Sequence, residues 1–197
     1  MNKSNLIVLE GVSGVGKTTI ANKLFEKGWL YISEVDEHHL AKKYTEEYFV
    51  IAEEIKIKKY VNSKADKIIM DRSPISIVAH NYVRKQLKLD NSYNSLTNWF
   101  EEVIKPIKDQ KFVYIRTDNF EECIKRKWGY NLERFPKKFL EVNGMKLWTQ
   151  KEPLRIFQEY YDNFFNSNSK SYNFKVIDAG NQIDEIVNLI IQFYEER

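Results

Sequence analysis

The sequence predicts an α/β fold in which a five-stranded parallel sheet is covered by helices on both faces. The first observation is a set of short apolar runs typical of buried strands, at 6–10, 29–32, 67–70, 112–115 and 174–178. The second is that the stretches between these runs repeat their apolar residues at the spacing of a helix. Strands that alternate with helices form parallel sheets buried on both faces, so a doubly covered sheet is expected.

The helices are expected at 20–25, 40–62, 74–87, 96–104, 120–128, 147–165 and 183–194. Pro74 suits the first turn of the third of these helices, whereas Pro153 argues against an unbroken helix over 147–165. In the second helix, Lys56, Lys58 and Lys59 are expected to form a solvated face.

Length and composition narrow the class of protein. A chain of 197 residues fits one domain with a substantial core, here taken as 1–197. The net charge of +3 is mild and spread out, which disfavours a nucleic-acid polymer as partner. The lone Cys123 excludes an intramolecular disulfide framework. The start leaves no room for a signal peptide and no apolar run approaches about 18 residues, so a cytoplasmic protein without membrane contact is expected.

The most informative stretch follows the first expected strand. Residues 11–18 fit G-x-x-x-x-G-K-[ST], and an apolar run and a helical pattern flank them as that motif requires. Glycines let the loop turn its N–H groups inward, and the helix dipole adds positive charge at the same place. This predicts a nucleoside triphosphate site formed by Gly11, Ser13, Gly14, Val15, Gly16, Lys17, Thr18 and Thr19. Lys17 would reach the β- and γ-phosphates and Thr18 would bind Mg²⁺.

Polar clusters follow the other expected strands, at the sheet edge where ligands bind in such folds. Asp71 is placed to bind Mg²⁺ beside the phosphate loop, and Arg72 to bind an acceptor oxygen or a substrate phosphate. The alternative for this pair is a structural ion pair at the end of a strand. Glu34 or Asp36 could accept a proton as a general base, although acidic residues at this position are also ordinary helix caps.

Cations late in the sequence predict a lid at about 126–145. Arg126, Lys127 and Arg134 suit a segment that closes positive charge onto a transferring phosphoryl group. The alternative is that cations at the end of a helix favour its dipole without a catalytic role.

These features together resemble the deoxynucleoside kinase and thymidylate kinase group of P-loop kinases. The resemblance is carried by 10–19, the acidic cluster at 34–37, Asp71-Arg72-Ser73, residues 114–117, Arg126 with Arg134, and 176–179. It implies a three-layer fold with strand order 2-3-1-4-5 and a lid, an ATP donor with Mg²⁺, and a small nucleoside or nucleoside monophosphate acceptor. It also implies that the loop at Asp178 borders the donor base and that a homodimer is possible.

The two branches of this group differ at particular positions. Deoxynucleoside kinases use a Glu after the second strand as base for the 5′-hydroxyl, and Glu34 matches it. Thymidylate kinases have an acidic residue where Ser13 stands and an Arg where Ser33 stands. The sequence therefore favours phosphoryl transfer to the 5′-hydroxyl of a deoxynucleoside, with Lys17, Glu34, Arg72, Arg126 and Arg134 as catalytic residues. The alternative is a deoxynucleoside monophosphate kinase, and a slowly hydrolysing regulator or a small-metabolite kinase is less favoured.

Overall fold

The structure is a computed structural model that describes residues 5–34, 46–89, 96–128 and 147–196, with the backbone alone at 46–48. Its centre is one five-stranded sheet in the order β2-β3-β1-β4-β5, in which every neighbouring pair is parallel. The strands are β1 (Leu6–Glu10), β2 (Leu30–Ile32), β3 (Ile68–Asp71), β4 (Lys111–Arg116) and β5 (Asn173–Asp178). Both the parallel sheet and the strand order are confirmed.

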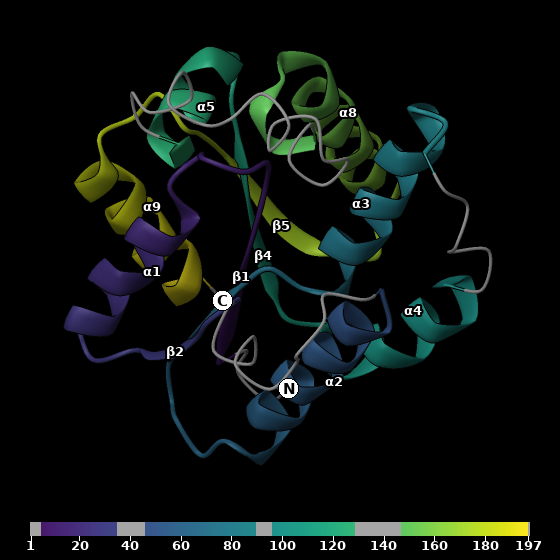
Figure 1. The fold of residues 1–197 in the computed structure, drawn as a ribbon. Helices are drawn as coiled ribbons and strands as arrows, with labels where there is room; N and C mark the ends of the chain where they lie inside the picture. The colour runs from purple at the N-terminus through teal and green to yellow at the C-terminus, as the bar shows by residue number, and fades with distance from the viewer. Residues whose placement is uncertain (1–4, 35–45, 90–95, 129–146, 197) are drawn as a thin grey trace.

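Helices cover the sheet on both faces (Figure 1). They are α1 (Lys17–Glu26), α2 (Glu46–Asn62), α3 (Pro74–Gln86), α4 (Leu96–Ile104), α5 (Phe120–Trp128), α8 (Lys151–Ser167) and α9 (Ile183–Glu195), with a 3₁₀ turn at Lys105–Ile107. Helices α1 and α9 contact each other on one face, while α3 contacts α2, α4 and α8 on the other. This is the three-layer arrangement that the sequence predicts.

The inner strands are apolar because they are covered on both faces. Leu6, Ile7, Val8 and Leu9 of β1 are all fully buried, and each such side chain contributes about 1.5–3 kcal/mol on leaving water. Glu10, the last residue of β1, is also fully buried. A buried carboxylate requires hydrogen-bond partners, and those of Glu10 lie at the edge of the sheet where β1 ends.

The expected helix over 147–165 is interrupted near its start, because residues 147–149 form a helical turn and Gln150 is not helical. The backbone at Gln150 is extended (φ −120°, ψ 144°), so α8 begins at Lys151 and ends at Ser167. Pro153 therefore lies in the first turn of α8, where its missing N–H removes no intrahelical hydrogen bond. Pro74 opens α3 as expected, and the Ser73 side chain accepts a hydrogen bond from the Ile75 N–H at 3.2 Å.

Among the residues that the structure describes, no helix has both the length and the apolar character needed to cross a membrane.

Candidate active site

The phosphate loop between β1 and α1 depends on glycine at two close approaches. Gly11 and Gly14 have φ of +136° and +85°. A Cβ at Gly11 would overlap the carbonyl oxygen of Ile115, and one at Gly14 would overlap the backbone of Cys123. The loop therefore packs directly on the end of β4 and on α5, and a larger residue at either position would displace it.

Lys17 lies inside this loop. Its ammonium group is buried and donates hydrogen bonds to the carbonyl oxygens of Gly11 (2.9 Å) and Val12 (2.8 Å). Burial, and next the positive charge of Arg72, lower the pKa of Lys17 to about 7, against the opposing effect of Asp71, Glu34 and Glu10. Negative phosphate groups in the loop would favour the charged lysine.

Thr18 and Asp71 meet at the mouth of the loop. The Thr18 hydroxyl donates to Asp71 Oδ2 at 2.8 Å, and Asp71 Oδ1 is buried without a hydrogen-bond partner. A free carboxylate oxygen beside a hydroxyl fits the oxygen ligands that Mg²⁺ prefers. Within the described ranges, no group of three or more His, Cys, Asp or Glu side chains could hold a metal. The fit is therefore to an ion that takes its other ligands from phosphates and water, as Mg²⁺ commonly does.

Arg72 and Glu34 lie across from the phosphate loop and form an ion pair. Arg72 Nε lies 2.7 Å from Glu34 Oε1, and Arg72 Nη1 donates to the Gly11 carbonyl oxygen at 3.2 Å. Burial alone would raise the pKa of Glu34, but Arg72, then Lys17, Lys56 and Lys127, hold it at about 2. Burial would likewise lower the pKa of Arg72, which Glu34 and other anionic neighbours raise overall. Both groups are thus ionised at neutral pH.

Arg72 also has an unusual backbone. Its φ is +68°, in the left-handed region that non-glycine residues seldom adopt. Such strain persists only where surrounding contacts fix it, and it concentrates at functional sites.

Glu10 forms a buried hydrogen-bond network next to Arg72. Its carboxylate accepts hydrogen bonds from the hydroxyls of Ser73 and Ser76, and Ser76 Oγ lies 3.0 Å from the Tyr161 hydroxyl of α8. Burial raises the pKa of Glu10, and the two serine hydroxyls oppose that shift. The network joins the end of β1 to the start of α3 and to α8.

These groups surround a cleft of about 470 Å³. Its lining consists of Ser13, Gly14, Gly16, Lys17, Thr18, Thr19, Glu34, Arg72, Arg126 and Lys127. Most residues predicted for the site are thus brought together, and Asp71 joins them through Thr18. Gly11 contributes its carbonyl oxygen, to Lys17 and to Arg72.

Other predicted residues lie apart. Val15 is buried in the core, and Asp178 is exposed at the end of β5, where its carboxylate accepts a hydrogen bond from the Gly180 N–H at 2.8 Å. Arg126 is at the mouth of the cleft, with Nε 3.2 Å from Glu122 of the preceding helical turn. Arg134, Asp36 and nearly all of the expected lid lie outside the described residues.

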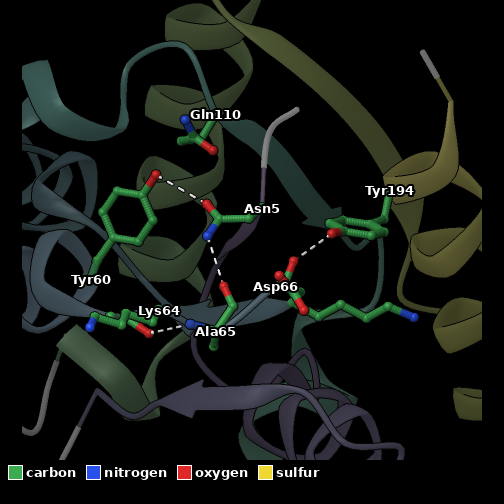
Figure 2. Close-up of a pocket in the computed structure, with 9 residues that line it drawn as sticks. Asn5, Tyr60, Lys64, Ala65, Asp66, Gln110 and Tyr194 are labelled. Carbon is green, nitrogen blue, oxygen red and sulfur yellow. Dashed lines mark hydrogen bonds between the residues drawn. The ribbon is translucent and has the colours of Figure 1, made fainter. Parts of the chain in front are cut away.

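A second hollow, of about 710 Å³, lies at the opposite edge of the sheet (Figure 2). Its polar groups pair with one another: Asn5 Nδ2 donates to the Ala65 carbonyl oxygen at 2.9 Å, and the Tyr194 hydroxyl donates to the Asp66 carbonyl oxygen at 2.6 Å. The smaller cleft instead has an unpartnered buried carboxylate oxygen next to it. The chemistry therefore favours the smaller cleft despite its size.

Two residues near the cleft escaped the sequence analysis. Lys56, expected on a solvated face, is buried at 1% exposure, and its ammonium group is 2.9 Å from Glu53 Oε1 and 2.9 Å from the Asp71 carbonyl oxygen. Lys58 and Lys59 are exposed as expected. The i,i+3 spacing of Glu53 and Lys56 was the available signal, but it does not separate a buried pair from an exposed one. Glu10 was noted only as part of the loop motif.

Comparison with known proteins gives matches in structure alone. No protein-family model matches the sequence, and no curated protein matches it. Deoxyadenosine kinase from M. mycoides with bound dATP matches over 96% of this chain and 99% of that one, with a TM-score of 0.70 and 20% identity. Thymidylate kinase from Candida albicans matches over 98% and 92%, with a TM-score of 0.61 and 18% identity.

A third match is the YorR protein from Bacillus subtilis in complex with phosphorylated GDP. It covers 96% of this chain and 95% of that one, with a TM-score of 0.58 and 23% identity. The chain has the fold of the deoxynucleoside and thymidylate kinase group. At these identities the likeness establishes the fold alone.

Proposed function

We propose that the protein is a kinase that transfers the γ-phosphoryl group of ATP to the 5′-hydroxyl of a deoxynucleoside. The observation that carries the proposal is the Glu34 carboxylate, held at 2.7 Å by Arg72 on the wall of a cleft whose other side is the phosphate loop. A base for an acceptor hydroxyl must lie near the transferring phosphoryl group and must be ionised. Glu34 lines the same cleft as the phosphate loop and its pKa is low, which supports this role.

In this reaction the 5′-hydroxyl loses its proton to Glu34, and its oxygen forms a bond to the γ-phosphorus. The bond from that phosphorus to the β,γ-bridging oxygen breaks, and ADP leaves with the bond's electron pair. The N–H groups of the loop and the Lys17 ammonium would stabilise the phosphate charge. Thr18 and Asp71 would hold Mg²⁺, which neutralises phosphate charge when bound.

Arg72 and the cations at the mouth of the cleft have supporting roles in the proposal. Arg72 orients Glu34 and faces the acceptor oxygen, and Arg126, with Arg134 of a lid at about 126–145, would supply charge to the transferring group. Asp178 would border the donor base. The structural match to the deoxyadenosine kinase with bound dATP supports a small nucleotide or nucleoside as acceptor. We further propose that 1–197 acts as one domain, in the cytoplasm and as a possible homodimer.

The second candidate is a deoxynucleoside monophosphate kinase, which the structural match to a thymidylate kinase favours. In that case Arg72 and Lys127 would bind the acceptor phosphate, and Glu34 would only position Arg72. A regulator is less favoured, because the cleft places a carboxylate suited to an acceptor hydroxyl beside the phosphate loop. A small-metabolite kinase is a less favoured alternative that the acceptor panels below would also exclude if a nucleoside is phosphorylated.

The test is ADP release from Mg·ATP with two acceptor panels. One panel holds the deoxynucleosides, deoxyuridine included, and the other holds their 5′-monophosphates. We expect turnover on a nucleoside. Turnover on monophosphates alone would establish the second candidate, and no turnover on either panel would reject both.

The matched variants are Glu34→Gln and Glu101→Gln. Loss of a general base lowers kcat by about 10²-fold or more, so we expect the kcat of Glu34→Gln to be lower than that of the wild type by that factor. Glu101 is an exposed carboxylate on α4, away from the cleft, so its variant should keep the wild-type kcat. Full activity of Glu34→Gln would remove Glu34 from its role.

A further inference from the structure

The backbone of Asp71 and Arg72 is held from outside the cleft by a buried lysine. Lys56 of α2 donates to the carbonyl oxygens of Asp71 (2.9 Å) and Arg72 (3.0 Å). The third partner of its ammonium group is Glu53 Oε1 at 2.9 Å, and both charged residues are buried. Three partners saturate the donors of the ammonium group, so its position is fixed.

The two carbonyl groups belong to the strained turn. Arg72 takes φ +68° directly after the end of β3, and its N–H donates to the Leu9 carbonyl oxygen at 2.9 Å. The Asp71 side chain points toward Thr18 on one side of this turn, and the Arg72 guanidinium points toward Glu34 on the other. Rotation of the Asp71–Arg72 peptide would therefore displace the metal ligand and the partner of the base at the same time.

We infer that Lys56 is a positioning residue that fixes this turn and thereby aligns Asp71 with Thr18 and Arg72 with Glu34. The inference rests on the proposed function for its effect on turnover. Lys56 does not line the cleft, so it does not contact substrate. It acts through the backbone that it holds, and its charge contributes to the low pKa of Glu34 after those of Arg72 and Lys17. The two carbonyl groups fix the position of the Lys56 ammonium group, and the Glu53 carboxylate offsets the cost of burying the positive charge of Lys56.

The experiment compares Lys56→Met with Lys111→Met. Lys111 is also buried, and it also donates to backbone carbonyl oxygens, those of Phe193, Tyr194 and Glu196, far from the cleft. Misplacement of catalytic groups by about 1 Å costs about 100-fold, so we expect that loss in kcat for Lys56→Met and none for Lys111→Met at a temperature where both are folded. Equal kcat values for the two variants would overturn the inference.

A double variant separates positioning from stability. Glu53→Leu with Lys56→Met removes both buried charges, and such apolar replacement often restores stability. Positioning predicts that the double variant regains the part of the urea midpoint that the unpaired Glu53 charge removes, but keeps the low kcat because the carbonyl oxygens of Asp71 and Arg72 stay without a donor. Recovery of kcat together with the midpoint would show that Lys56 is only structural.

Two readouts do not need turnover. Fluorescent mant-ADP binding is measured with and without MgCl₂, and loss of an outer partner of a metal ligand weakens metal binding about 10- to 100-fold. We expect Lys56→Met to lose Mg²⁺-dependent tightening by about tenfold and to keep Mg²⁺-free binding. Hydrogen–deuterium exchange over 71–76 should be faster than in Lys111→Met.

These readouts also distinguish the two proposals. If the wild type phosphorylates neither panel, the proposed function fails, while altered Mg²⁺ dependence in Lys56→Met still supports the positioning role. If Mg²⁺ does not change wild-type mant-ADP binding, or if Lys56→Met leaves both readouts unchanged, the positioning role is wrong.

Discussion

Two buried lysines at opposite edges of the sheet have the same hydrogen-bond chemistry and different consequences. Lys56 binds carbonyl oxygens of a strained turn at the carboxyl edge, next to the cleft. Lys111, the first residue of β4, binds the last carbonyl oxygens of α9 at the amino edge. The first holds the backbone of two residues beside the cleft, and the second satisfies carbonyl groups that every helix end leaves unpaired. The difference teaches that a buried lysine cannot be assigned a role from its own contacts; what its partners carry decides it.

The largest effect that would break this comparison is expected at the phosphate loop. In Gly14→Ala the new Cβ would overlap the backbone of Cys123, so the loop must move. We expect mant-ADP binding to weaken about 100-fold, the loss that corresponds to one or two hydrogen bonds from the loop to a charged phosphate. Titration by fluorescence measures it.

Gly28→Ala is the matched control for that variant. Gly28 also has φ +85°, but no atom lies within 4 Å of its added Cβ. Only left-handed strain remains, so a loss of about 1 kcal/mol in unfolding free energy is expected, with unchanged nucleotide affinity. Similar affinities for the two variants would show that the loop tolerates the shift.

The next effect is expected for Asp71→Asn at the carboxyl edge. The amide can keep a hydrogen bond to Thr18 but removes the negative charge that would hold Mg²⁺, so kcat should fall about 100-fold. The buried unpartnered Oδ1 is a cost to the fold, so the urea midpoint should not fall with it. A parallel drop in kcat and midpoint would mean that Asp71 is structural.

At the amino edge the order of effects should reverse. Lys111→Met leaves the carbonyl oxygens of Phe193, Tyr194 and Glu196 without their donor, at 2.6, 3.2 and 2.6 Å in the wild type. We expect the unfolding free energy to drop by about 2–3 kcal/mol, measured by urea denaturation, with kcat intact. A loss of kcat in the folded variant would erase the contrast between the two edges.

The smallest effect is a loss of stability at low pH, and it arises from His80, which belongs to neither of the two lysine sites. His80 of α3 is 5.7 Å from Trp148 and 6.0 Å from Phe157 between ring centroids. Burial, and next Arg84 and Arg72, lower the pKa of His80 from 6.5 to about 4. Between these values the unfolded chain binds the proton more readily, so the wild type loses stability as pH falls from 6.5 toward 4.

His80→Phe should remove that part of the acid response. Urea denaturation at pH 7 and pH 5 should show a loss smaller by about 1–2 kcal/mol than in the wild type. An identical loss in the two proteins would place the response on groups other than His80.

The sequence predicted best what is decided locally. The loop between β1 and α1 is specified within residues 11–18, and the strands are short apolar runs, so both appear in the structure as expected. The strand order came from family resemblance, because a run of apolar residues does not state which run it pairs with. The start of α8 was misplaced because only the extended backbone at Gln150 separates it from the helical turn before it.

Helix α2 shows why the rest could not be predicted. Ile51 and Val61 are exposed at 46% and 60%, while Glu53 and Lys56 are buried at 5% and 1%. Two apolar residues of this helix thus face solvent and two charged residues face inward beside the buried Ala52 and Ile57, so apolarity alone does not identify its inner face. The carbonyl partners of Lys56 come from the end of β3. The spacing of residues within α2 gives no information on hydrogen bonds to a carbonyl group of another element. The unusual φ of Arg72 is equally invisible in the sequence.

One contact at the end of α5 has a consequence for the entropy of closing the chain that follows it. The Trp128 indole N–H donates to the Trp148 carbonyl oxygen at 3.1 Å, and Lys127 Nζ lies 5.1 Å from the centre of the Trp148 ring. These contacts join residues 127 and 128 to residue 148, which are separated by a long stretch of sequence. Closing a longer stretch costs only about 0.6 kcal/mol for each doubling of its length. Loop-closure entropy alone would therefore change little with the number of residues between Trp128 and Trp148.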